Sequence, residues 1–121
     1  MSQTIATAAG REKLAKARAG VIPLPKCAFI ALGDGGELQA PSDTAEGLFN
    51  EVIRKEITQV TFPSPATAAY TIKLSVTECA GVIFDEIGLF DEDGTLIAIK
   101  TFGGKQKDSD MEMSFEIDDV F

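Results

Sequence analysis

The chain has 121 residues, a formal net charge of −8 and a hydrophobic content of 45%. This is the size and composition of one domain, which we expect to span residues 1–121. The absence of histidine excludes triad or acid–base chemistry that depends on that side chain, as well as zinc sites with histidine ligands. Two cysteines are too few for a four-cysteine zinc site.

The charge is unevenly distributed along the chain. Residues 1–60 contain seven bases and seven acids, whereas residues 61–121 contain four bases and twelve acids. The whole net charge therefore lies in the second half. A solvated acidic face explains it, and such a face repels nucleic acid and membranes and suits a basic partner surface.

The N-terminal residues 1–20 carry charges throughout and contain no apolar run of the length found in signal peptides. No stretch is long and apolar enough for a membrane-spanning helix, so we expect no membrane insertion. Because disulfides are rare in a reducing cytosol, we expect Cys27 and Cys79 to be small buried hydrophobes, with a disulfide as the less favoured alternative.

The first predicted element is a helix over Thr7–Ala19. Thr7 is suited to cap its N terminus. Lys16 and Arg18 fall in the last turn, where cations complement the helix dipole. Gly20 suits the position that follows the C-cap, because glycine adopts positive φ easily.

An almost entirely apolar strand is expected at Lys26–Leu32, and it ends in the glycine-rich run Gly33–Gly36. We expect these glycines to allow positive φ and a sharp change of direction. A second helix is predicted at Ala45–Glu56, capped by one of residues 42–44. Its apolar face would be built around residues 48–53, where Leu48, Val52 and Ile53 have helical spacing.

From Ile57 onward the sequence alternates with a period of two residues, which is typical of strands with one buried face. The predicted fold class is α+β, with two helices in the N-terminal half packed on a mostly antiparallel, sandwich-like sheet of five to six strands. Besides the first strand, strands are expected at residues 57–62, 70–77, 82–90, 96–102 and 111–117, with a polar loop at 103–110.

Two short motifs resemble ligand-binding loops. The run Gly33–Gly36 carries an acid and lacks the lysine of a phosphate-binding loop, so we interpret it as a structural turn. The run Asp91–Gly94 begins like a calcium-binding loop, but strands are expected on both sides. We predict a hairpin of type I′ or a related type there, with an adventitious calcium site as the alternative.

The adjacent acids Asp85 and Glu86 invite comparison with the paired carboxylates of glycosidases. Neighbours on a strand point to opposite faces, whereas catalytic carboxylates must face each other across a substrate. One of the two would then point inward and need a hydrogen bond or an ion pair, for which Lys100 is a candidate. No catalytic, cofactor-binding or metal-binding residue is predicted.

Four motifs occur in the order found in the N-terminal domain of the phage tail-collar fibre protein family, which this chain resembles. The motifs lie at residues 4–10, 30–36, 48–55 and 86–98, and the last is the most specific. The residues that match the pattern of the family are Gly10, Gly33, Asp34, Gly35, Gly36, Glu51, Arg54, Glu86, Gly88, Leu89, Phe90, Asp91 and Gly94.

The resemblance implies a structural virion protein that is made in the host bacterial cytoplasm and located in the phage or prophage tail. Its expected role is to attach a tail fibre to the baseplate of a contractile tail, or to cap a fibre position there. It implies no enzymatic activity and no cofactor. The implied partners are baseplate and tail proteins, with a trimer as the expected oligomer in the assembled particle.

The partner interface is expected to include the acidic end of the chain, at Asp118, Asp119 and Phe121, together with exposed strand edges and the N-terminal helix. The alternative function is a free-standing carbohydrate- or peptide-binding β module, and a small glycan hydrolase is a more distant one. A binding module would need an open edge strand or exposed aromatic side chains, for which Tyr70, Phe62 and Phe121 are the candidates.

Overall fold

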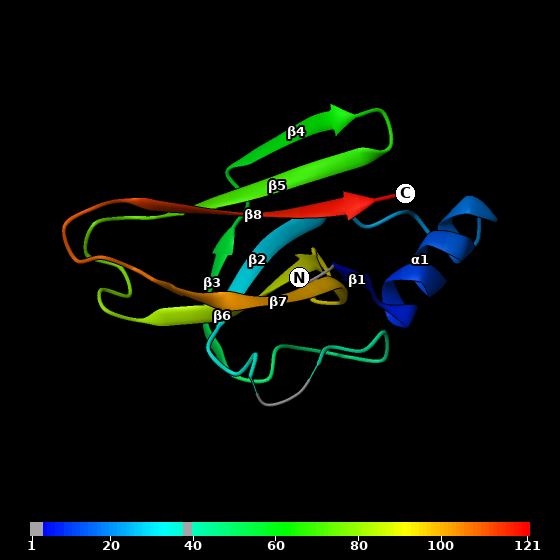
Figure 1. The fold of residues 1–121 in the computed structure, drawn as a ribbon. Coiled ribbons are helices and arrows are strands. Elements are labelled where there is room, and N and C mark those ends of the chain that lie inside the picture. Colours follow the sequence, from blue (N-terminus) through cyan, green and yellow to red (C-terminus); the bar gives the residue numbers. More distant parts are fainter. Residues whose placement is uncertain (1–3, 38–39) are drawn as a thin grey trace.

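In the computed structural model, which describes residues 4–37 and 40–121, the chain forms two antiparallel sheets and one helix at their end (Figure 1). The larger sheet has the strand order β1-β7-β6-β2-β3, and the smaller has the order β4-β5-β8. The elements are β1 (Ile5–Ala6), α1 (Ala8–Arg18), β2 (Cys27–Gly33), β3 (Glu51–Glu56), β4 (Gln59–Ser64), β5 (Thr67–Leu74), β6 (Ile83–Asp91), β7 (Leu96–Gln106) and β8 (Met113–Val120).

The predicted α+β class with two helices is wrong, because the chain is 49% strand and only 9% helix. The six predicted strands are present with shifted bounds, and β1 and β3 are additional. The expected polar loop at residues 103–110 is partly wrong, since β7 continues to Gln106. No helix in the described part of the chain is long and apolar enough to cross a membrane.

The second predicted helix does not exist. Residues 45–50 are irregular, and β3 pairs antiparallel with β2. The three apolar residues that suggested one helical face lie in different environments. Leu48 packs against a cluster around Phe90, Ile53 packs against the core between the sheets, and Val52 is exposed. Their helical spacing is therefore coincidental.

The main core lies between the two sheets. Both contribute large apolar side chains to it, and Phe84 and Phe115 meet edge to face with ring centroids 5.6 Å apart. The buried members of this core are Ile30, Leu32, Ile72, Leu74, Phe84, Ile87, Leu89, Ala98, Phe115 and Ile117. A second, smaller cluster of Ala31, Phe90, Leu96 and Ile99 packs with Ile5, Phe29, Ala45 and Leu48.

The helix α1 is held by its N terminus rather than by an apolar face, since none of its residues is buried. Thr7 is the N-cap, as predicted, and its hydroxyl accepts a hydrogen bond from the Gly10 N–H at 3.0 Å and donates to the Leu96 carbonyl. Gly10 lets the helix approach β7, because a Cβ there would lie 3.1 Å from the Cα of Ile97. Gly20 has φ +81°, as expected after the C-cap.

Replacing Thr7 by Val should lower the free energy of unfolding by about 2 kcal/mol, because the fully buried hydroxyl serves both as the helix cap and as a donor to β7. Thr7→Ser keeps the hydroxyl and should cost much less. Urea unfolding of the two variants compares them, and equal losses would contradict this role of the hydroxyl.

Candidate functional site

Glu86 is fully buried on β6, and backbone amides surround its carboxylate. Its Oε2 accepts hydrogen bonds from the N–H groups of Gly35 at 2.9 Å and Asn50 at 2.8 Å, and its Oε1 accepts one from the Phe49 N–H at 2.8 Å. Hydrogen bonds to a charged acceptor are stronger than neutral ones and compensate for its burial. Glu86 thus ties the glycine-rich loop and the segment before β3 to a central strand.

Asp85 faces the same loop as Glu86, which corrects the prediction that the two side chains point to opposite faces. Its Oδ1 accepts a hydrogen bond from the Gly36 N–H at 2.7 Å. Phe84 and Ile87 both belong to the core between the sheets, so the alternation of β6 is interrupted between them. The pairing of β6 with β7 is irregular at the same point, as in a β-bulge.

One of the two acids was expected to point inward and need a partner; Glu86 is that acid, and backbone amides are its partners. Lys100 lies opposite Ile87 on β7. In residues 4–37 and 40–121, Glu86 forms no ion pair, so the suggested pair with Lys100 is not present.

The glycines of the loop are required by close approach and not by positive φ, which none of the three adopts. A Cβ on Gly33 would lie 2.3 Å from the Asn50 carbonyl oxygen, and one on Gly36 would lie 2.4 Å from that of Asp85. Such distances are shorter than any real contact of a Cβ. The expectation of left-handed glycines is therefore wrong, and lack of space is the physical reason for these residues.

Most other residues of the family pattern also support this framework. Asp34 accepts a hydrogen bond from the Asn50 side chain, and Glu51 holds Arg54 through two hydrogen bonds of 2.8 and 3.1 Å. The Arg54 guanidinium lies 3.8 Å from the centroid of the Phe90 ring, a cation–π contact.

Gly88 makes room for the irregular segment before β3, because a Cβ there would lie 2.9 Å from the Leu48 side chain. Leu89, the next residue of the family pattern, is fully buried in the core between the sheets.

The hairpin between β6 and β7 is organised by Asp91. Its Oδ1 accepts hydrogen bonds from the N–H groups of Asp93 and Thr95, both at 2.9 Å, and its Oδ2 pairs with Lys13 of α1 at 3.0 Å. A type I′ turn needs two residues with positive φ, and here only Gly94 has it, at +86°. The suggestion of type I′ is therefore wrong, although the hairpin itself is confirmed.

The carboxylates of Asp85, Glu86 and Asp91 accept hydrogen bonds from backbone amides, and Asp91 also pairs with Lys13, so these groups are poorly placed to act on a substrate. Among the described residues, no three acidic or thiol groups are arranged to hold a metal ion. The framework is best understood as a rigid support.

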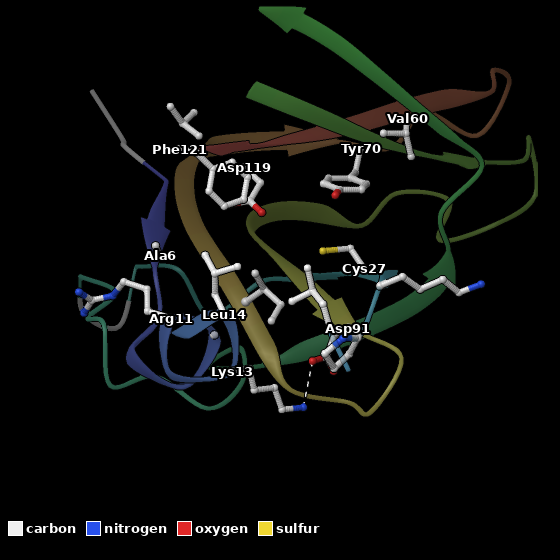
Figure 2. A pocket seen from close by; sticks show the side chains of 16 residues that line it. Ala6, Arg11, Lys13, Leu14, Cys27, Val60, Tyr70, Asp91, Asp119 and Phe121 are labelled. Atoms are coloured by element: carbon white, nitrogen blue, oxygen red, sulfur yellow. Dashed lines mark hydrogen bonds and ion pairs between the residues drawn. The ribbon is translucent and has the colours of Figure 1, made fainter. Parts of the chain in front are cut away.

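A groove of about 590 Å³ opens beside this support, between α1, the segment before β2 and the end of the smaller sheet (Figure 2). Its walls are mostly apolar. Leu14 and Cys27 lie on one side of the hollow, with Tyr70 and Asp119 on the other. The lining residues are Ala6, Gly10, Arg11, Lys13, Leu14, Leu24, Pro25, Lys26, Cys27, Val60, Tyr70, Asp91, Ile97, Asp119, Val120 and Phe121.

Two of the three predicted interface residues line this groove. Phe121 is 71% exposed, and its N–H donates to the Ala66 carbonyl at 2.8 Å, which holds its backbone in place. Asp119 is half-buried, and this burial raises the pKa of its carboxyl group. Asp118 is not among the lining residues.

Sequence reasoning missed the groove residues Leu24, Val60 and Cys27. Leu24 is 61% exposed between two prolines, and Val60 is 45% exposed on the edge strand β4. The apolar run Val21–Pro25, which has no strand or helix period, was the available signal. Cys27 and Cys79 are free, half-buried thiols, and burial raises the pKa of both.

Gly36→Ala should lower the free energy of unfolding by about 2 kcal/mol or more, because the new methyl group would collide with the Asp85 backbone. Gly47→Ala is the matched control: Gly47 has ordinary φ and no atom within 4 Å of a Cβ, so its change should stay within about 0.5 kcal/mol. Chemical denaturation measures both, and equal effects would contradict the close-approach argument.

Asp119→Asn should stabilise the chain at neutral pH. Because the raised pKa makes the folded chain bind a proton more tightly than the unfolded chain, the free energy of unfolding falls as the pH rises through the window between the two pKa values. The facing groups Cys27 and Tyr70 stay neutral in this window.

The variant Asp119→Asn should therefore have a higher free energy of unfolding than the parent above that pH window, and the two values should be equal below it. Thermal unfolding between acidic and neutral pH measures this difference, with the exposed Asp110→Asn as the control. A constant difference at all pH values would contradict the assignment.

Comparison with known proteins adds independent information. Residues 1–116 match the family described as phage tail-collar fibre protein, N-terminal. A relative described as a probable tail fiber protein of Escherichia phage P2 is 32% identical over 107 residues. The match covers 87% of this chain but 16% of that protein, so the chain spans a small part of the length of its relative. No solved structure matches.

Proposed function

This chain belongs to the phage tail-collar fibre protein family, and on that premise we propose that it attaches a tail fibre to the baseplate of a contractile tail, or caps a fibre position there. Membership makes it a structural component of the virion tail that associates with other tail components. The attachment to the baseplate, the single attachment domain over residues 1–121 and a trimer in the assembled particle are parts of the proposal.

The observation that carries the proposal is the combination of a rigid framework with an open apolar groove. The acids that could have suggested chemistry hold backbone amides or Lys13 instead. The large apolar side chains around the groove remain exposed. Such a surface favours binding to another protein over turnover of a substrate. We therefore propose that the role is not enzymatic.

The acidic second half of the chain adds an electrostatic component. With a net charge of −8 in residues 61–121, a partner with a basic surface would associate faster and more specifically than a neutral one. Asp118 and Asp119 lie at the end of β8, close to the groove, and are placed to contribute to this attraction.

The test uses the purified chain and fibre-less tails from the phage or prophage that encodes it, with cosedimentation as the measurement. The chain should bind, and Asp118→Lys combined with Asp119→Lys should weaken binding about tenfold or more and reduce its dependence on salt. Unchanged affinity and salt dependence would overturn the electrostatic part.

A chain that binds no tails, but is retained by immobilised glycans or short peptides, would overturn the attachment proposal. It would support the alternative of a free-standing binding module. Light scattering of the same sample gives the oligomeric state, and a stable monomer both alone and on the tail would overturn the trimer.

A further inference from the structure

We propose that the groove between α1 and the smaller sheet is the docking site for an apolar segment of a tail protein, and that this segment carries a lysine or arginine that pairs with Asp119. The inference rests on the proposed attachment function and names the surface that performs it.

The rim of the groove gathers apolar side chains that a free protein has no reason to expose together. Leu24, Val60, Val120 and Phe121 are between 45% and 71% exposed, and they come from three separate parts of the chain. Exposed apolar residues are normal when scattered, but a cluster around a hollow marks a contact surface. A partner segment with apolar side chains would cover this rim and fill the hollow.

The charged groups of the groove are mostly neutralised within the chain. Arg11 pairs with Asp43 at 3.1 Å, and Lys13 pairs with Asp91 at 3.0 Å. The third cation, Lys26, forms no ion pair with the residues that the structure describes, because the N–H that donates to the Glu92 carboxylate at 2.7 Å is its backbone amide.

Asp119 differs from Asp91, the other acid of the groove, which pairs with Lys13. Its carboxylate lines the groove, is half-buried and has no hydrogen bond or ion pair with any residue in the ranges 4–37 and 40–121. Desolvation without a partner makes the charged form costly, so this acid reduces stability where it stands. A lysine or arginine from a docked segment would provide the missing counter-charge.

The same charges argue against a second copy of the chain as the occupant. Two copies would each carry a net charge of −8, all of it from residues 61–121, the half of the sequence that supplies β8 to the groove. Like charges at close range disfavour such pairing. A basic and apolar segment from a different tail protein fits both the rim and the charge.

The walls of the groove are already ordered, which lowers the entropic cost of docking. The α1 wall is fixed by its cap at Thr7 and by the Lys13–Asp91 pair, and the β8 wall is paired with β5 along its whole length. The partner segment therefore meets a preformed surface.

Matched variants test the apolar rim. Val60 and Val76 are the same residue type and are both 45% exposed, but only Val60 lines the groove. We expect Val60→Ser to weaken binding to fibre-less tails about fivefold and Val76→Ser to change it less than twofold. Phe121→Ser and Phe62→Ser form a second pair, at 71% and 70% exposure, with the same expected contrast.

Asp119→Asn tests the counter-charge in the same assay. It should weaken binding about fivefold or more while leaving the fold intact, since it removes a charge that stabilises no internal contact. Asp110→Asn removes an equal charge from an exposed turn and should have little effect. Circular dichroism of every variant confirms that the fold is retained. Equal effects within each matched pair would overturn the inference.

The two cysteines provide a direct readout of occupancy. Cys27 lines the groove and Cys79 lies elsewhere, and both are half-buried free thiols. In the tail-bound chain, alkylation of Cys27 by iodoacetamide should slow about fivefold or more relative to the free chain, whereas alkylation of Cys79 should not change. Mass spectrometry of the bound fraction measures both rates.

The outcomes separate this inference from the proposed function. If the chain binds tails but Cys27 stays equally reactive, attachment stands and the groove is not the docking site. If the chain binds no tails at all, the attachment proposal itself fails, and the docking inference fails with it.

Discussion

The hydrogen bonds between the buried Glu86 carboxylate and three backbone amides hold together parts of the chain that are far apart in sequence. They join β6, the glycine-rich loop after β2 and the segment before β3. The loop can approach this closely only because Gly33, Gly35 and Gly36 have no side chains. A carboxylate buried in this way would be very costly without its donors, so the glycines and the acid depend on each other.

One side of the molecule is covered by the irregular segment before β3, whereas the side next to α1 carries the exposed groove. On the covered side, the irregular segment around Leu48 covers Gly88 and the small cluster with Phe90. On the groove side, α1 stands over the end of the sheets, anchored by Thr7 and by the Lys13–Asp91 pair. The groove exists because this helix is held at its N terminus and buries none of its own residues.

The predictions were most accurate where local rules act alone. The cap at Thr7, the glycine after α1 and the alternating strands depend on short-range geometry, and they are present. The helix predicted at residues 45–56 failed because Glu86 captures the N–H groups of Phe49 and Asn50, which a helix would use internally. Sequence periodicity also could not predict the β-bulge at Asp85. This bulge interrupts the two-residue alternation of β6, so Asp85 and Glu86 both face the glycine-rich loop.

The sequence by itself determined the family, the location of the charge and most of the strands, because motifs, composition and periodicity are written along the chain. It also marked Asp119 and Phe121 as interface candidates. Only the tertiary structure brought these two residues to one groove with Leu24, Cys27 and Val60. The reason is physical: exposure and desolvation depend on which distant segments pack together, and periodicity along a single strand carries no information about that.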